Sequence, residues 1–134
     1  MTDVRNYNPK TLAFMGDAVY EALVREKIIL DSERPIGELN KLKTKIVCAE
    51  AQSEVYGFLE NLLSEEENAV MKRGRNISAV NGPKSANIGD YRRATGIEAL
   101  FGYLYLSKKN ERIRELFEII WDREQKLILN GDLV

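Results

Sequence analysis

Apolar residues recur at helical spacing along almost the whole chain, and this regularity limits the fold more than any other feature. Leu12, Met15, Val19 and Leu23 lie three or four residues apart, as one face of an α-helix requires. The same period returns in later segments, and no run alternates between apolar and polar residues as a half-buried strand does. The sequence therefore predicts an all-α fold of about six helices.

Local signals predict where several of these helices begin. Asn8 is a capping residue followed by proline, and a second start is expected at Arg34-Pro35. Ser64 with Glu67 three residues on is a capping box. Either Asn87 or Asp90 is expected to cap a later helix, which leaves the start of that helix open. The expected helices cover about 9–27 or beyond, 35–47, 49–63, 64–73, 87–106 and 110–127.

Length and composition indicate one globular domain. The 134 residues are 44% hydrophobic and 31% charged, which allows one packed core and a charged surface. Because the chain has no long apolar run and no apolar leader, we expect a cytoplasmic protein without a membrane partner. The single cysteine, Cys48, excludes an intrachain disulfide and a cysteine zinc cluster, and we expect it to be a small buried side chain.

The absence of histidine restricts the chemistry of any active site. It excludes a Ser-His-Asp triad, a Cys-His pair, histidine-bound zinc and histidine acid–base catalysis. An enzyme with this composition has to use carboxylates, lysine, tyrosine, hydroxyl groups or a hard metal cation.

Positive charge is concentrated in one segment, residues 72–93. This segment carries six basic residues and one acidic residue, for a net +5, whereas the rest of the chain carries −6. Three glycines and Pro83 within it predict a flexible loop. Such a loop either contacts a polyanion or is only a solvated surface segment, and the charge count does not separate the two interpretations.

Two apolar helical segments each carry an isolated acid. Asp17 and Glu21 are the only charged residues between positions 11 and 24, and Glu98 is the only one between 94 and 107. An ionised carboxylate is costly to bury unless it is paired or bound to a metal. Glu21 lies one helical turn after Asp17 and shares its face of the helix. It is either an additional ligand of a metal bound there or a solvated surface residue.

These acids have two interpretations. In the first, Asp17 and Glu98 meet and hold a hard cation such as Mg²⁺, and Gly16, Gly96 and Gly102 let the two helices approach closely. In the second, each acid lies at the rim of the core and forms an ion pair. The cations considered for that pairing are Arg92, Arg93 and lysines.

The apolar side chains exceed what six short helices can bury around one small core. We expect the aromatic residues of the two acidic helices to pack in the core rather than stack on bases: Phe14, Tyr20, Phe101, Tyr103 and Tyr105. A two-fold interface between identical chains would bury the remaining apolar surface. The sequence therefore predicts a homodimer.

Short motifs along the whole chain resemble a known enzyme family. The stretch F-M-G-D-A-V-Y-E at 14–21 resembles the signature helix of the ribonuclease III catalytic domain, and E-A-L-F-G-Y-L-Y-L at 98–106 resembles its second acidic helix. M-K-R-G-R-N at 71–76, P-K-S-A-N at 83–87 and D-Y-R-R-A-T at 90–95, together with the short length, are similar to mini-ribonuclease III.

The resemblance implies an activity. Residues 1–134 would form one all-α endonuclease domain without a separate RNA-binding domain. It would cleave double-stranded RNA as a homodimer, with Mg²⁺ (Mn²⁺ as a substitute) and no nucleotide cofactor. The products would carry 5′-phosphates and short 3′ overhangs. The implied substrate is the precursor of 23S ribosomal RNA, matured at both ends.

The resemblance also implies roles for single residues. Asp17 and Glu98 would be catalytic and would bind the metal. We expect contacts to RNA from the basic segments, at Lys72, Arg73, Arg75, Asn76, Lys84 and Arg92. Ala13 and Thr95 stand where full-length relatives carry two further acids, which leaves the number of metals open. This departure supports one alternative, a non-catalytic RNA-binding ribosome-assembly protein on the same fold. A further alternative is a helical interaction module without an RNA role, in which the basic loop is only solvated.

Overall fold

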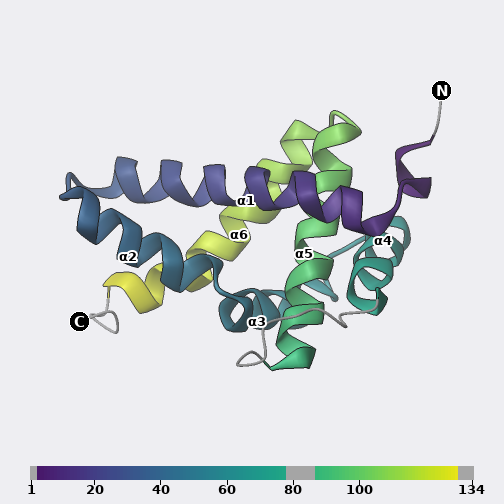
Figure 1. The fold of residues 1–134 in the computed structure, drawn as a ribbon. Helices are drawn as coiled ribbons and strands as arrows, with labels where there is room; N and C mark the ends of the chain where they lie inside the picture. The colour runs from purple at the N-terminus through teal and green to yellow at the C-terminus, as the bar shows by residue number, and fades with distance from the viewer. Residues whose placement is uncertain (1–2, 78–86, 130–134) are drawn as a thin grey trace.

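The computed structural model describes residues 3–77 and 87–129 (Figure 1). A short 3₁₀ helix, η1, covers Val4–Asn6, and six α-helices follow in this part of the chain. Their bounds are α1 Pro9–Asp31, α2 Ile36–Val47, α3 Ala49–Leu59, α4 Glu65–Asn76, α5 Ile88–Leu106 and α6 Asn110–Leu129. The described ranges contain no strand, so the predicted all-α class is confirmed. None of their helices is long and apolar enough to cross a membrane.

The predicted helix caps are present. The Asn8 side chain accepts a hydrogen bond from the backbone N–H of Lys10 at 2.8 Å. Ser64 and Glu67 form both halves of the capping box, at 2.9 and 3.1 Å. The sequence left the cap of α5 open, and the structure identifies Asn87, whose side chain accepts from the N–H of Asp90. Side chains next to the helices thus fix these starts.

Two helix ends differ from expectation. Helix α3 stops at Leu59 rather than near Leu63, and α4 continues to Asn76 rather than ending near Arg73. The second difference changes the basic segment, because residues 72–76 are helical and do not begin a loop. Lys84, within the expected loop, lies outside the described residues.

Gly74 explains why α4 continues through a residue that normally weakens helices. A Cβ atom added to Gly74 would lie 2.7 Å from the Cβ of Ala99 on α5, and one added to Gly96 would lie 2.7 Å from the backbone oxygen of Met71. The two glycines therefore let α4 pack directly on α5. Gly96 serves this contact and not the approach of α1, to which the sequence interpretation assigned it.

Helix α5 runs through the middle of the molecule, with α1 crossing it on one side and α3 and α4 packed around it (Figure 1). Nine of its residues are buried, from Ala94 to Leu104. Because α5 is covered on nearly all sides, a charged residue on it has little access to water. This burial sets the environment of Glu98.

The aromatic residues divide between the core and the surface. Tyr20 packs edge-on against Phe101, with ring centroids 5.3 Å apart, as expected for core residues. Phe14 and Tyr105 do not: 84% and 46% of their surface is exposed. Cys48 is also exposed, because it lies at the junction between α2 and α3 rather than inside a helix. The expectation of a core position was wrong for these three residues.

Candidate functional site

The site is built where α1 crosses α5. A Cβ atom on Gly16 would lie 1.6 Å from the backbone oxygen of Glu98, and one on Gly102 would lie 1.9 Å from that of Leu12. The two helix backbones are therefore in direct contact, as predicted for Gly16 and Gly102. Asp17 follows Gly16, so this crossing holds Asp17 beside Glu98.

The two carboxyl groups interact directly. Asp17 is exposed, whereas Glu98 is partly buried. Burial raises the pKa of the Glu98 carboxyl to about 8, and the Asp17 carboxyl adds to the rise through its charge and a shared hydrogen bond. Two carboxyl groups in this arrangement repel each other when both are ionised. They are stabilised by sharing a proton or by a bound cation.

No cation of the described residues pairs with either acid. The ion pairs found in residues 3–77 and 87–124 all involve other carboxylates. Arg93, one of the partners considered from the sequence, donates to Asp90 at 3.1 Å and to Ser53 at 2.5 Å instead. The ion pairs of the second interpretation are therefore absent from the described residues, and the influence of Asp17 on Glu98 agrees with the first interpretation, whose metal stays a prediction.

The donor set around these acids is small. In the described part of the chain no group of three or more Asp, Glu, Cys or His side chains is arranged to hold a metal ion. Ala13 is buried, and the Thr95 hydroxyl donates to the backbone oxygen of Tyr91 at 3.0 Å. Two carboxylates suit a hard cation that keeps several of its waters, as Mg²⁺ does. The residues present therefore fit a hydrated Mg²⁺ ion.

Glu21 has a role that the sequence interpretation did not anticipate. Its carboxylate pairs with Arg25 at 2.7 Å and with Lys43 of α2 at 3.8 Å. The partner on α1 follows from the four-residue spacing. Lys43 gives no such local signal, because it reaches Glu21 only through the packing of α2 on α1.

The basic residues of α4 face solvent and have local partners. The Arg73 guanidinium donates to the backbone oxygens of Arg5 and of Tyr7, the latter at 3.3 Å, and so ties the N-terminal segment to α4. The Arg75 guanidinium lies 5.7 Å from the centre of the Tyr56 ring. Because residues two apart are turned about 200° around a helix, these contacts hold the two side chains on different sides of α4.

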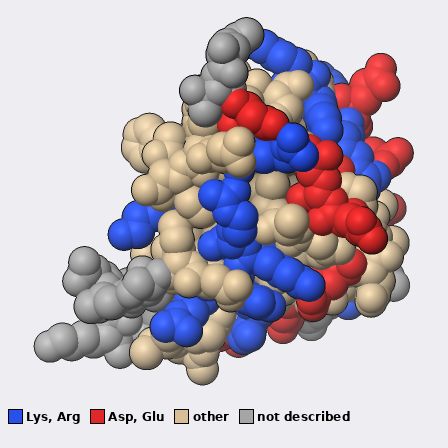
Figure 2. All heavy atoms as spheres, turned by 90° about the vertical axis from the view of Figure 1, so that its right-hand side faces the viewer, with Lys and Arg blue, Asp and Glu red and all other residues tan. Residues whose placement is uncertain are grey.

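The remaining predicted RNA contacts are spread over two elements. Lys72 and Asn76 are exposed on the last turns of α4, and Arg92 is exposed on the first turns of α5. Figure 2 views the side of the molecule on which α4 lies and shows a band of Lys and Arg side chains down that face. Positive charge in the last turn of α4 is also favourable for that helix, because the C-terminal end of a helix carries partial negative charge.

The fold and the paired acids place the chain in a known class of nuclease. The ribonuclease III domain family matches residues 10–109. The chain belongs to this family and is an endoribonuclease of the ribonuclease III type.

Individual relatives are mini-ribonucleases 3. The chain is 43% identical to the Mini-ribonuclease 3 of Thermoanaerobacter sp. over 87% of this chain and 82% of that protein. It is 47% identical to the Mini-ribonuclease 3 of Brevibacillus brevis over 83% of each. A crystal structure from Fusobacterium nucleatum superposes with a TM-score of 0.81 and 37% identity, over 92% of this chain and 99% of that one.

Proposed function

We propose that this endoribonuclease hydrolyses double-stranded RNA with Mg²⁺ held by Asp17 and Glu98. The observation that carries the proposal is the contact between these two carboxyl groups without a counter-cation from the described residues. When both carboxyl groups are ionised, such a pair is unfavourable unless a bound cation joins it. Mn²⁺ has the same preference for oxygen ligands and would replace Mg²⁺.

The two acids have different tasks in this mechanism. When bound, Mg²⁺ would stabilise negative charge on the scissile phosphate and acidify a water molecule. Asp17 is exposed and would hold the metal from the solvent side, whereas Glu98 is partly buried and would hold it from the core side of the crossing. The backbone contact between α1 and α5 at Gly16 would keep the carboxylates of Asp17 and Glu98 in place before RNA binds. No step requires a histidine.

The RNA backbone would be held by the basic residues of α4 and α5. Duplex RNA is recognised mainly through phosphates and 2′-hydroxyls, which exposed basic side chains contact without base specificity. The residues we assign to this contact are Lys72, Arg73, Arg75, Asn76, Lys84 and Arg92. Each neutralised phosphate should make binding more sensitive to salt.

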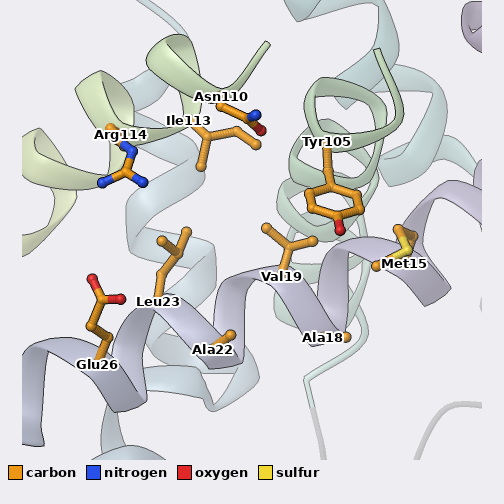
Figure 3. A pocket seen from close by; sticks show the side chains of 10 residues that line it. All are labelled: Met15, Ala18, Val19, Ala22, Leu23, Glu26, Tyr105, Asn110, Ile113 and Arg114. Atoms are coloured by element: carbon orange, nitrogen blue, oxygen red, sulfur yellow. The ribbon is translucent and has the colours of Figure 1, made fainter. Parts of the chain in front are cut away.

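We also propose that two copies of the chain assemble around the exposed apolar face of α1. Phe14 projects from this face, and next to it lies a groove of about 390 Å³ between α1, α5 and α6 (Figure 3). Met15 and Val19, together with Tyr105 and Ile113, supply its apolar walls. One two-fold interface would cover Phe14 and the groove together and would place two sites on one RNA duplex, one for each strand.

The cellular role follows the resemblance to mini-ribonuclease III. We propose that the protein acts in the cytoplasm on the precursor of 23S ribosomal RNA, with residues 1–134 as one catalytic domain. The mini-ribonuclease 3 relatives support this assignment through their similarity along most of the chain.

Cleavage of labelled long duplex RNA by the wild type and by Asp17→Asn tests the proposal. The wild type should cleave with Mg²⁺ and not with chelator. Asp17→Asn should lose at least about 100-fold of the rate while it still binds RNA, because the change removes a charge at the site and keeps the shape. Asp122→Asn, an exposed aspartate of α6, serves as the matched control and should retain activity. Cleavage in chelator, or an active Asp17→Asn, would contradict the proposal.

A further inference from the structure

A lysine from α2 lies beside the strip of α1 that carries Asp17. Glu21 follows Asp17 by one turn of helix, about 5.4 Å along the axis. The Nζ atom of Lys43 lies 3.8 Å from one Glu21 oxygen, and Arg25 contacts the other oxygen at 2.7 Å. The ammonium of Lys43 is therefore fixed to the face of α1 from which the Asp17 carboxylate projects.

The Lys43 side chain is placed differently from those of the neighbouring lysines. Only 21% of its surface is exposed, so its hydrocarbon stem is packed while its charged end stays near Glu21. Lys41 is exposed and lies two residues earlier, which turns it about 200° around the helix axis. Lys43 thus points toward Glu21 on α1, one turn from Asp17, whereas Lys41 points to solvent on the other side of α2.

The contact with Glu21 does not use the full bonding capacity of this ammonium. A lysine ammonium has three N–H donors, and 3.8 Å is longer than a hydrogen bond. A surface ion pair of this kind contributes little to stability. Its position matters more, because Asp17 and Glu21 concentrate negative charge where a polyanionic strand has to approach. A cation held there reduces the repulsion.

We propose that Lys43 is a further RNA-binding residue, which contacts a backbone phosphate next to the one cleaved, and that Glu21 holds its ammonium in place. The assignment rests on the proposed function, since it needs the RNA strand to pass over Asp17. It adds α2 to the RNA-binding surface, which the charge distribution of the sequence confined to residues 72–93.

Lys43→Gln and Lys41→Gln make a matched pair, because both remove one positive charge from the same helix. Binding of duplex RNA is measured in chelator, without cleavage, over a series of salt concentrations. Lys43→Gln should weaken binding about 10-fold and make the log–log salt dependence shallower by about one unit. Lys41→Gln should change the affinity less than threefold and leave the slope unchanged. Lys43→Arg, which keeps the charge, should bind close to wild-type affinity.

Equal effects of Lys43→Gln and Lys41→Gln would overturn the inference, because they would reflect only the net charge of the protein. Thermal melting of each variant verifies that the folded protein is compared. A failure of the proposed function gives a different result, since the wild type itself would then not cleave duplex RNA with Mg²⁺. If the wild type cleaves duplex RNA and Lys43→Gln binds it as tightly as the wild type, the RNA contact of Lys43 is rejected and the proposed function stands.

Discussion

The carboxyl group of Glu98 is partly buried and that of Glu124 is buried, and neither has an ion-pair partner among the described residues. Burial raises the pKa of Glu124 to about 7, the charge of Glu54 adds to the rise, and Arg123 partly opposes it. Glu98 adjoins Asp17 and has a candidate function. Glu124 is not one of the candidate metal ligands, so a change at Glu124 leaves both of those carboxyl groups in the protein.

We expect Glu124 to make stability depend on pH. Its pKa is about 7 in the folded protein and 4.5 ordinarily, so the folded state binds the proton more tightly. Its contribution is fully present below about pH 4.5 and is lost as pH rises through 7. Glu124→Gln removes this dependence. In denaturant unfolding, the free energy of unfolding of Glu124→Gln minus that of the wild type should increase by about 2 kcal/mol between pH 5 and pH 8. An advantage that is equal at both pH values would contradict the assignment.

At the scale of helices, the site depends on the contact between α1 and α5. Gly16→Ala would place a methyl group 1.6 Å from the Glu98 carbonyl oxygen, so the helices have to separate. We expect a loss of about 3 kcal/mol or more in the free energy of unfolding, together with loss of cleavage. Chemical denaturation and the duplex-cleavage assay measure the two effects.

Gly57→Ala is the control for that change. Gly57 lies inside α3, and a Cβ atom there meets nothing within 4 Å. Alanine should therefore stabilise α3 by about 0.5–1 kcal/mol and leave cleavage unchanged. If Gly16→Ala behaved like Gly57→Ala, the close approach of α1 and α5 would not be what positions the two acids.

The helices show which features of the fold and of the site could be predicted from local sequence signals. Helix starts were predictable because caps such as Asn8 and Ser64 act within a few residues. The pairing of Asp17 with Glu98 was foreseen because isolated acids in apolar helices are costly unless they meet a partner. Gly74 was misjudged, since a glycine gives the same local signal whether it ends a helix or packs against another one.

Contacts between helices distant in sequence account for the other differences. Periodicity predicts that Phe14 lies on an apolar face, but it does not reveal whether this chain covers that face. The link from Lys43 to Glu21 depends on how α2 packs against α1, which no local pattern encodes. Such features become visible only when the helices are assembled.

For the whole molecule, the faces of α1 separate three tasks. One face packs on α5 and includes Gly16, a second carries Asp17 and Glu21, and a third presents Phe14 to solvent. The Phe14 face adjoins the Asp17 face, because residues three apart on a helix are neighbours. A two-fold interface on the Phe14 face would therefore bring the acids of two chains to the edges of a shared surface.

Phe14→Asp tests this arrangement. A charge at the centre of the proposed interface is costly to bury, so the variant should sediment as a monomer at micromolar concentration, where the wild type should sediment as a dimer. Its helical circular dichroism should be unchanged, because 84% of the Phe14 surface is exposed in the single chain. Cleavage of duplex RNA should fall, since each monomer offers one site to one strand. Ile36→Asp alters another largely exposed apolar residue, at the start of α2 and outside the lining of the groove, and should stay dimeric. A monomeric wild type, or a dimeric Phe14→Asp, would mean that α1 does not form the interface.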